Sequence, residues 1–162
     1  MAKLIEIKVG EMAIGDKDTV ISTNGIGSCV AVCVYDPIKK VGGMIHAMLP
    51  TRIGVSAFGS NQFRSDDHIA KYVDEGIKRL VEEVRYLGGK KDRIVAKLVG
   101  GSRMFKYLND ERTGIGPKNI EMAHKILGEL NVPIESEDIG GTTGRMAEFN
   151  LDNFILSISI KI

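Results

Sequence analysis

A cysteine and a histidine in neighbouring apolar segments of this chain could act as a nucleophile and its base. Cys29 opens the segment CVAVCVY, and His46 lies within GMIHAML. A cysteine attacks as its thiolate, so it needs a base within hydrogen-bond reach. We expect His46 to be that base and to lower the pKa of the Cys29 thiol. The predicted chemistry is nucleophilic catalysis by a thiolate.

A β-hairpin is expected to bring these two residues together. The turn Asp36–Lys39 has a proline that presets its φ and an aspartate that can accept hydrogen bonds from the following backbone. Pairing Tyr35 with Lys40 closes the hairpin, and counting outward then places Cys29 directly opposite His46. Directly opposed residues have Cβ atoms about 4.5 to 5.5 Å apart, so thiol and imidazole would touch. A bulge at the GG pair of the second strand would shift this register by one residue.

The turn NGIGS supplies further groups for such a site. Thr23 ends the strand before this turn, where its hydroxyl could orient the imidazole. The glycines of the turn permit a close backbone approach. Its amides could stabilise an oxyanion. The sequence therefore predicts catalytic roles for Cys29, His46 and Thr23, and an oxyanion-binding role for the backbone at Gly27 and Ser28.

Packing is the alternative explanation for the cysteine and the histidine. Free cysteine is among the most buried residue types, and strand residues of both kinds more often belong to a core than to a catalytic site. Cys33 lies four residues along the strand from Cys29, about 13 Å away and too far for a disulfide, so we expect a core residue. Redox sensing by Cys29 is a third alternative.

Other motifs give weaker signals. GIGSCV lacks the third glycine of a dinucleotide fingerprint and precedes a strand pattern rather than a helix. The DIGGTTGR turn could bind an anion through its amides and Arg145, or its glycines could only permit positive φ between strands. His68 and His124 fall in amphipathic helical patterns and are expected to be solvated. The dispersed histidines and cysteines predict no metal site.

Composition favours one well-buried domain over residues 1–162, with 43% hydrophobic residues and a formal net charge of +1. The near-neutral charge gives no electrostatic footprint for nucleic acid. No apolar run approaches the about 20 residues of a membrane span, and the N-terminus lacks the apolar core of a signal peptide. We therefore expect a cytoplasmic protein with free thiols that neither binds nucleic acid nor inserts into a membrane.

Hydrophobic periodicity predicts strands joined partly by hairpins and partly by helices. The expected strands are Lys3 to Val9, Thr19 to Thr23, CVAVCVY, GMIHAML, RIVAKLV, Ile134 to Ile139, RMAEFN and FILSISI. The expected helices start at Asp66 or Asp67 and near Pro117, and residues 51–65 and 100–116 are expected to be long loops. Because CVAVCVY is apolar on both faces, one sheet must be covered on both sides. The predicted fold is α+β, with mixed β-sheets and two main helices packed on one side in helix/sheet/sheet layers.

Five motifs together resemble the CheD family of chemoreceptor glutamine deamidases. They are TNGIGSC, HAMLP, GGSRMF, IGPKNI and DIGGTTGR, in the family's order and over nearly the whole chain. Ile26 stands where a leucine is common in the family, and residues 51–65 show no clear pattern. The resemblance implies that Cys29, His46 and Thr23 are the catalytic residues. It also implies a fold related to deamidating bacterial toxins.

The resemblance also implies a reaction and partners. The reaction would be cofactor-free hydrolysis of glutamine side-chain amides to glutamate on methyl-accepting chemotaxis receptors, in chemotaxis adaptation. A CheC-type phosphatase would be the second partner. The alternative is mainly a docking module for that phosphatase, with minor deamidase or glutamyl methylesterase activity. Met104 and Phe105 are a candidate apolar docking anchor or else core residues, and Phe105 and Arg145 are candidate partner or substrate contacts.

Overall fold

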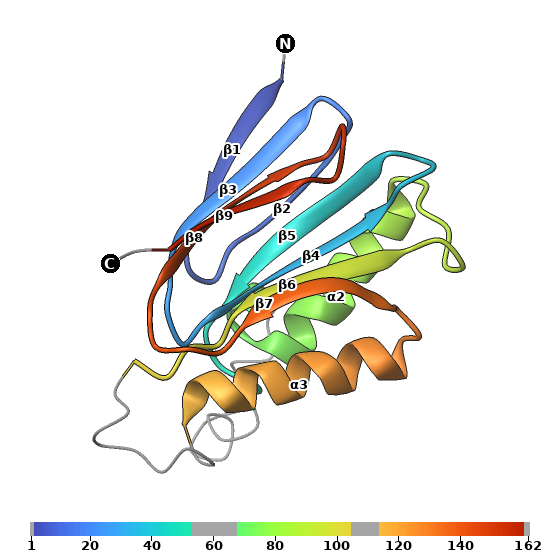
Figure 1. Ribbon diagram of the computed structural model, residues 1–162. Coiled ribbons are helices and arrows are strands. Elements are labelled where there is room, and N and C mark those ends of the chain that lie inside the picture. Colours follow the sequence, from blue (N-terminus) through green and yellow to red (C-terminus); the bar gives the residue numbers. More distant parts are fainter. Residues whose placement is uncertain (1, 53–67, 105–113, 161–162) are drawn as a thin grey trace.

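The computed structural model describes residues 2–52, 68–104 and 114–160, and this part of the chain forms two β-sheets and two main helices (Figure 1). The strands are β1 (Lys3–Ile7), β2 (Met12–Asp16), β3 (Thr19–Ile26), β4 (Val30–Asp36), β5 (Val41–Ala47), β6 (Val95–Gly100), β7 (Ile134–Ile139), β8 (Arg145–Asn150) and β9 (Leu156–Ile160). The helices are the 3-10 turn η2 (Ile69–Lys71), α2 (Val73–Tyr86) and α3 (Ile115–Glu129).

Each sheet mixes parallel and antiparallel strand pairs. The strand order is β1-β3-β8-β9 in the four-stranded sheet and β2-β5-β4-β6-β7 in the five-stranded sheet. β1 is parallel to β3 and β6 is parallel to β7, while the other pairs of named strands are antiparallel. The parallel pair β6 and β7 requires a crossover, which α3 provides. The predicted α+β fold with mixed sheets is confirmed.

The five-stranded sheet is the middle layer of the fold. Figure 1 shows α2 and α3 on one of its faces and the four-stranded sheet on the other. β4 is buried along its whole length, because its alternate side chains enter two different cores. Val30, Val32 and Val34 pack toward the helices. Ala31, Cys33 and Tyr35 pack toward the four-stranded sheet. The predicted helix/sheet/sheet layering is therefore confirmed.

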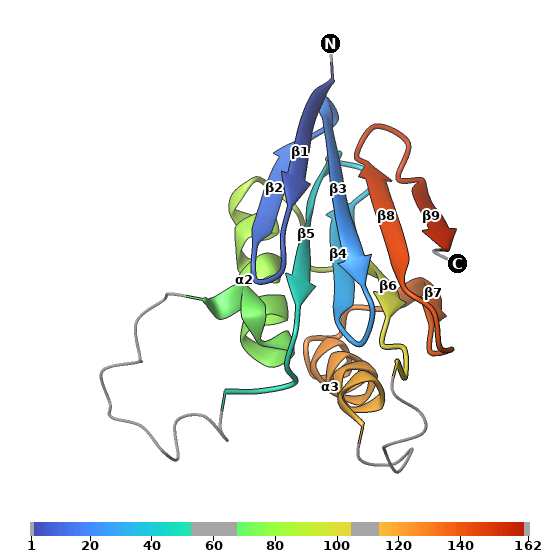
Figure 2. The same cartoon turned by 90° about the vertical axis from the view of Figure 1, so that its left-hand side faces the viewer.

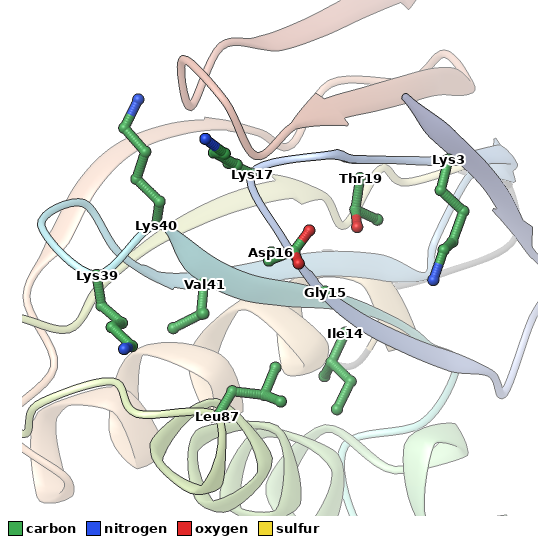
Figure 3. Close-up of a pocket in the computed structure, with 10 residues that line it drawn as sticks. All are labelled: Lys3, Ile14, Gly15, Asp16, Lys17, Thr19, Lys39, Lys40, Val41 and Leu87. Carbon is green, nitrogen blue, oxygen red and sulfur yellow. The ribbon is translucent and has the colours of Figure 1, made fainter. Parts of the chain in front are cut away.

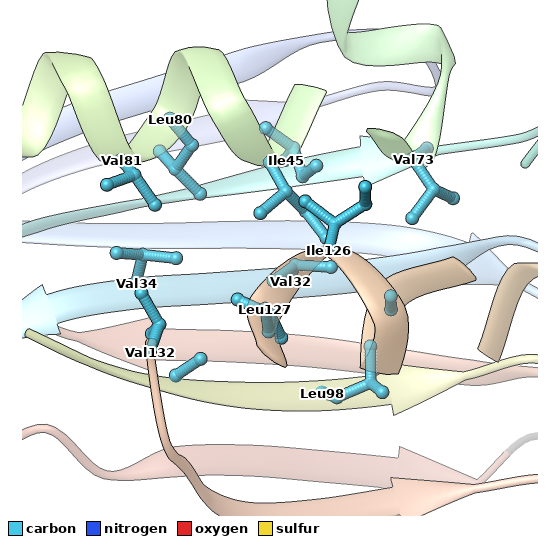
Figure 4. Close-up of a cluster of buried hydrophobic side chains, with 14 of the residues drawn as sticks. Val32, Val34, Ile45, Val73, Leu80, Val81, Leu98, Ile126, Leu127 and Val132 are labelled. Atoms are coloured by element: carbon cyan, nitrogen blue, oxygen red, sulfur yellow. The ribbon is translucent and has the colours of Figure 1, made fainter. Parts of the chain in front are cut away.

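The core beneath the helices is built from branched aliphatic side chains (Figure 4). Leu80 on α2 and Leu127 on α3 are fully buried there with Val32 on β4. Fully burying one such side chain is worth about 1.5 to 3 kcal/mol. This core holds the helices on the middle sheet and makes β4 and β5 a rigid support for the residues at their ends.

Several element boundaries differ from the prediction. No strand was predicted between Val9 and Thr19, but Met12–Asp16 form the edge strand β2, which pairs with β5 from Met12 opposite Ile45 to Asp16 opposite Val41. β3 continues past Thr23 to Ile26. Short edge strands such as β2 carry little apolar alternation, so periodicity did not reveal this one.

The start of α2 differs from the prediction, whereas α3 begins near Pro117 as predicted. α2 starts at Val73 after the 3-10 turn, and its N-cap Tyr72 makes no side-chain cap. The predicted capping residues Asp66 and Asp67 lie outside the described residues. α3 starts at Ile115, two positions before Pro117, so this proline lies in the first helical turn, where it is tolerated.

Four segments that are distant in the sequence meet at one end of the two sheets. Figure 2 shows the β3–β4 turn, the end of β6, the β7–β8 turn and the start of α3 close together. Main-chain hydrogen bonds join the first three, including Gly101 N to Cys29 O at 2.7 Å and Gly140 N to Gly100 O at 2.9 Å, and the side chain of Asn119 joins α3 to the β3–β4 turn. The predicted site residues lie at this end of the molecule.

Candidate active site

The β4–β5 hairpin brings Cys29 and His46 to one face of the middle sheet, but in a different register from the one predicted. His46 lies opposite Ala31, and Asp36 lies opposite Val41. Cys29 lies one residue before β4, so it is diagonal to His46 and not directly opposite. Diagonal neighbours are farther apart than directly opposed residues, and His46 Nε2 makes no hydrogen bond to the thiol. A shift of two residues keeps both side chains on the same face, whereas a shift of one would separate them.

The hairpin loop explains the shifted register. It has four residues, Pro37 to Lys40, and so lies one position later along the chain than the predicted turn Asp36–Lys39. Lys40 adopts a left-handed φ of 61°, and its N–H donates to Asp36 O at 2.9 Å. Tyr35 therefore pairs with Gly42. The ladder continues regularly through the glycine pair, so the bulge considered there is absent.

His46 and Thr23 lie on different sheets and are joined by a hydrogen bond. Thr23 Oγ1 is 2.7 Å from His46 Nδ1 and 2.7 Å from the carbonyl oxygen of Ile7. Thr23 is on β3 of the four-stranded sheet, where it pairs with Ile7 of β1, and His46 is on β5 of the middle sheet. Both side chains are buried. The imidazole is therefore held between the two sheets.

Proton counting assigns the tautomer of the imidazole. A threonine hydroxyl has one proton, and the carbonyl of Ile7 can only accept, so Thr23 donates to Ile7. The hydroxyl oxygen must then accept from His46 Nδ1–H. The neutral ring consequently carries its lone pair on Nε2. This atom is buried and has no hydrogen-bond partner among the described residues. An unpaired Nε2 is suited to accept a proton from a thiol.

Burial keeps both groups of the pair neutral. It lowers the pKa of His46 to about 4. It also raises the pKa of Cys29, although a hydrogen bond from the residue's own backbone N–H acts in the opposite direction. The expectation that His46 lowers the pKa of this thiol is wrong for this geometry, because desolvation dominates. The arrangement is that of a neutral thiol with a neutral base, so proton transfer would accompany attack.

The carbonyl groups of the turn before β4 are all held by the neighbouring segments. The pairs are Gly27 O with Ser102 N at 2.9 Å, Ser28 O with Asn119 Nδ2 at 2.9 Å and Cys29 O with Gly101 N at 2.7 Å. The C=O and N–H of a trans peptide point in opposite directions. The N–H groups of Ser28 and Cys29 therefore point away from the loop after β6 and from α3, and in the described part of the chain neither donates to a main-chain carbonyl.

The GGS and GGTTGR motifs form the support behind this turn. Ser102 Oγ lies 2.7 Å from Thr143 O and 3.1 Å from Gly140 O, and it receives Arg145 Nη1 at 3.0 Å. Arg145 Nη2 lies 3.3 Å from Asp138 Oδ1. Arg145 is only 5% exposed. The structure thus places Arg145 in the support of the turn, and its predicted contact with a partner or substrate stays a prediction.

Other candidate residues lie apart from this site or outside the described residues. Cys33 is buried between the two sheets as a free thiol, as expected for a core residue. His124 is exposed and bonds Glu137 Oε2 at 2.7 Å. Met104 is 44% exposed and lies against Gly27. Phe105 lies outside the described residues.

Ser102 and Asn119 are two buried polar residues of the site to which no role was assigned from the sequence. Asn119 is three residues after Gly116, so both lie on one face of α3. A Cβ on Gly116 would lie 2.3 Å from Ser102 O. A glycine and an asparagine on the inner face of an otherwise apolar helix are a signal of close backbone contact, and this pattern could have identified them.

A cavity of about 500 Å³ lies at the opposite ends of the strands, near the hairpin loop (Figure 3). Lys3, Lys17, Lys39 and Lys40 line it together with Asp16. The ammonium of Lys40 binds the carbonyl and carboxylate of Asp152, and Figure 3 shows Lys39 and Lys40 pointing in different directions. The lysines do not converge on one point, so we assign no ligand to this cavity.

Two further findings concern the described residues. They contain no group of three or more His, Cys, Asp or Glu side chains that could hold a metal ion. No helix among them is long and apolar enough to cross a membrane.

An oriented imidazole with an unpaired Nε2, in the same hairpin as a half-buried cysteine, defines a candidate site for nucleophilic hydrolysis on an α+β fold. Comparison with known sequences identifies the family. A family model described as CheD chemotactic sensory transduction matches residues 48–160. This chain belongs to the CheD family. The matched segment begins after His46 and therefore does not include Thr23, Cys29 or His46.

Curated relatives match over nearly the whole chain. A probable chemoreceptor glutamine deamidase CheD of Pyrococcus horikoshii is 39% identical over 149 residues, 92% of this chain and 87% of the relative. The chemoreceptor glutamine deamidase CheD of Halalkalibacterium halodurans is 38% identical, covering 98% of this chain and 94% of the relative. That of Thermotoga maritima is 39% identical, covering 90% and 85%.

A solved structure of the Bacillus licheniformis hypothetical protein YfiH aligns with a TM-score of 0.47 and 13% sequence identity, over 79% of this chain and 50% of that chain. This similarity is too low to support an inference about function.

Proposed function

We propose that this protein hydrolyses glutamine side-chain amides to glutamate on methyl-accepting chemotaxis receptors, with Cys29 as nucleophile, His46 as base and Thr23 as the residue that orients the base. The observation that carries the proposal is the chain of hydrogen bonds from His46 Nδ1 through Thr23 Oγ1 to Ile7 O, because it leaves Nε2 as a buried, unpaired acceptor. The names of the curated relatives support the choice of substrate. A receptor's signalling region as substrate would place the reaction in the cytoplasm.

The first half of the reaction forms a thioester. His46 Nε2 takes the thiol proton as Cys29 Sγ attacks the carboxamide carbon, and the carbonyl oxygen becomes an oxyanion. The backbone N–H groups at Ser28 and Cys29 point away from their supporting segments and are the proposed donors to this oxygen. When the oxyanion collapses, the C–N bond breaks, and the protonated imidazole gives its proton to the leaving ammonia.

The second half of the reaction returns the enzyme to its starting state. Neutral His46 takes a proton from water, whose oxygen attacks the thioester carbon. The C–S bond then breaks, the sulfur recovers the proton from the imidazole, and glutamate is released. No step requires a redox group or a second substrate besides water. A glutamyl methyl ester would follow the same path with methanol as leaving group.

The test is incubation with receptor signalling domains followed by peptide mass spectrometry. Wild-type protein should convert specific glutamines to glutamate, and Cys29→Ala should convert none. Cys33→Ala is the matched control, since Cys33 is a second free thiol that faces the core. The Cys33→Ala variant should keep deamidase activity, but its free energy of unfolding should be lower than that of wild type. Conversion by Cys29→Ala at the wild-type rate would refute the assigned nucleophile.

The CheC-type phosphatase is the proposed second partner. Met104 supports a docking role for the rim of the site, because this large apolar side chain is 44% exposed beside Gly27. If docking is the main role, Met104→Asp should weaken phosphatase binding, measured by calorimetry. The rate at which Cys29 is alkylated should stay at the wild-type value, as a control that the site is unchanged. Unchanged binding of the phosphatase would argue against this surface.

A further inference from the structure

Asn119 is a fully buried amide on α3 that lies between the two backbone segments of the site. Its Nδ2 donates to Ser28 O at 2.9 Å and to Met48 O at 3.1 Å. Ser28 immediately precedes the cysteine, and Met48 follows His46 by two residues. One side chain therefore ties the turn that carries Cys29 to the end of the strand that carries His46.

The chemistry of its partners fixes the orientation of this amide. Both partners are carbonyl oxygens, which only accept hydrogen bonds, so the NH₂ end of Asn119 must face them. Its Oδ1 is buried and receives no hydrogen bond from any described residue. An unpaired buried acceptor is unfavourable for folding. Residues that break such a local rule without an evident gain in stability are expected at functional positions.

The bond to Ser28 controls the peptide group that contains the amide of Cys29. Ser28 C=O and Cys29 N–H belong to one trans peptide and point in opposite directions. By holding the carbonyl toward α3, Asn119 turns the N–H away from the helix. The backbone N–H of Cys29 also lowers the pKa of its own thiol, against the larger effect of burial. The orientation of this one peptide thus affects both the sulfur and the proposed oxyanion donor.

We infer that Asn119 is a positioning residue, which orients the Ser28–Cys29 peptide and sets its place relative to the strand of His46. The small Gly116 on the same helix face lets α3 approach closely enough for this contact, because a Cβ there would clash with Ser102 O. The catalytic consequence of the inference rests on the proposed function, and the orientation of the peptide does not.

The kinetic test compares Asn119→Leu with wild type. Leucine has nearly the same branched shape but no donor, so both carbonyls lose their bonds. We expect kcat for deamidation to fall about 10- to 100-fold, with KM within about threefold of wild type, because a misplaced catalytic group slows the chemical step more than binding. Ile126→Val is the matched control, since Ile126 is buried in α3 within the helix-facing core. It should keep the wild-type kcat.

The second measurement does not depend on the receptor. The rate of Cys29 alkylation by iodoacetamide is followed against pH by site-resolved mass spectrometry. A change in the accessibility of Cys29 multiplies the alkylation rate at every pH, whereas the midpoint of the rate against pH reports the pKa of the thiol. Asn119→Leu should move the midpoint to higher pH, because a misoriented Cys29 N–H no longer lowers the pKa of the thiol. Asn119→Ala is measured in the same way if the leucine variant does not fold.

The outcomes separate the two claims. A shifted midpoint in a system where wild-type protein deamidates no receptor would support the positioning role and refute the proposed function. An unshifted midpoint in a folded variant would overturn the inference. The inference would also be overturned if kcat fell only in proportion to the fraction of folded protein, measured by circular dichroism at the assay temperature.

Discussion

Thr23 Oγ1 and His46 Nδ1 lie 2.7 Å apart although they belong to different sheets. The same hydroxyl donates to Ile7 O on the edge strand β1. Stacking of the two sheets is therefore what sets the orientation of the imidazole. Any change in the distance between the sheets would alter the position of Nε2, so the stability of the sheet interface and the geometry of the site are linked.

The first prediction concerns the hydroxyl of Thr23. Thr23→Val keeps the shape of the side chain but leaves Ile7 O and His46 Nδ1–H without their partner. We expect kcat for deamidation to fall about 10- to 100-fold. This loss is smaller than the full contribution of a positioned general base, because the imidazole is still present. Thr23→Ser keeps the hydroxyl and should retain most of the activity. Steady-state kinetics on both variants checks this, and a wild-type kcat in the valine variant would show that the hydroxyl does not orient the ring.

The second prediction is that stability depends on pH through His46. Its pKa is lowered to about 4 in the fold, against 6.5 for the unperturbed side chain. Between these values the unfolded state binds more protons, so the free energy of unfolding falls as the pH falls from about 6.5 to about 4. Above about pH 6.5 the imidazole is neutral in both the folded and the unfolded state, so stability no longer depends on pH through His46. The expected loss across the window is about 3 kcal/mol.

Denaturant unfolding at pH 7 and pH 4.5 measures this dependence. His46→Gln cannot titrate, so its free energy of unfolding should lose less between the two pH values than that of wild type. The imidazole signals of His46 followed by NMR should titrate near pH 4. Titration near pH 6.5 would mean that the ring is not desolvated as described.

The sequence predicted the hairpin that carries Cys29 and His46 better than its register. The apolar strands revealed the middle sheet, because a strand buried on both faces has an unmistakable composition. The pairing of Cys29 with His46 was wrong by two residues, since the loop conformation at Lys40 depends on hydrogen bonds that composition does not report. Both candidates nevertheless stayed on one face, because a shift of two residues preserves the alternation of side chains.

The partners of the supporting residues could not be found from the sequence. Asn119 and Ser102 act through contacts with segments far along the chain, namely the turn before β4 and the turn before β8. Periodicity describes only the element to which a residue belongs, so it assigns such residues a place in a helix or loop but no partner. The edge strand β2 was missed for a related reason, because its strand character comes from pairing with β5.

The third prediction concerns the carboxylate of Asp36, which anchors the hairpin loop. Burial alone would raise the pKa of Asp36, but hydrogen bonds from Arg93 and from the amides of Lys90, Lys39 and Ile38 hold it at about 2. Asp36→Asn should lower the free energy of unfolding by about 2 kcal/mol at pH 7, because it loses charge-assisted hydrogen bonds. Chemical denaturation checks the value.

The pH range of its effect distinguishes Asp36 from His46, because the pKa of both groups is lowered and both lose stability as the pH falls. The pKa of Asp36 is lowered from 3.8, so its contribution is present above about pH 4 and is lost as the pH falls toward 2. The stability gap between wild type and Asp36→Asn should therefore narrow only below pH 4. Asp92→Asn, an exposed neighbour of Arg93, is the control and should change stability by less than about 0.5 kcal/mol. A gap that stays constant down to pH 2 would contradict the ionised, hydrogen-bonded carboxylate.

The fourth prediction uses two glycines with opposite surroundings. Gly100 ends β6 with a φ of +113°, and a Cβ there would lie 2.4 Å from Cys29 O. Gly100→Ala should both strain the backbone and displace the cysteine, so deamidase kcat should fall and the protein should be destabilised by about 1 to 3 kcal/mol.

Gly128 lies in α3, and a Cβ there would meet nothing within 4 Å. Gly128→Ala should stabilise the protein by about 0.5 to 1 kcal/mol with no change in kcat. Thermal unfolding and kinetics on the two variants test whether backbone space at the cysteine limits activity. Equal kcat values for the two variants would show that it does not.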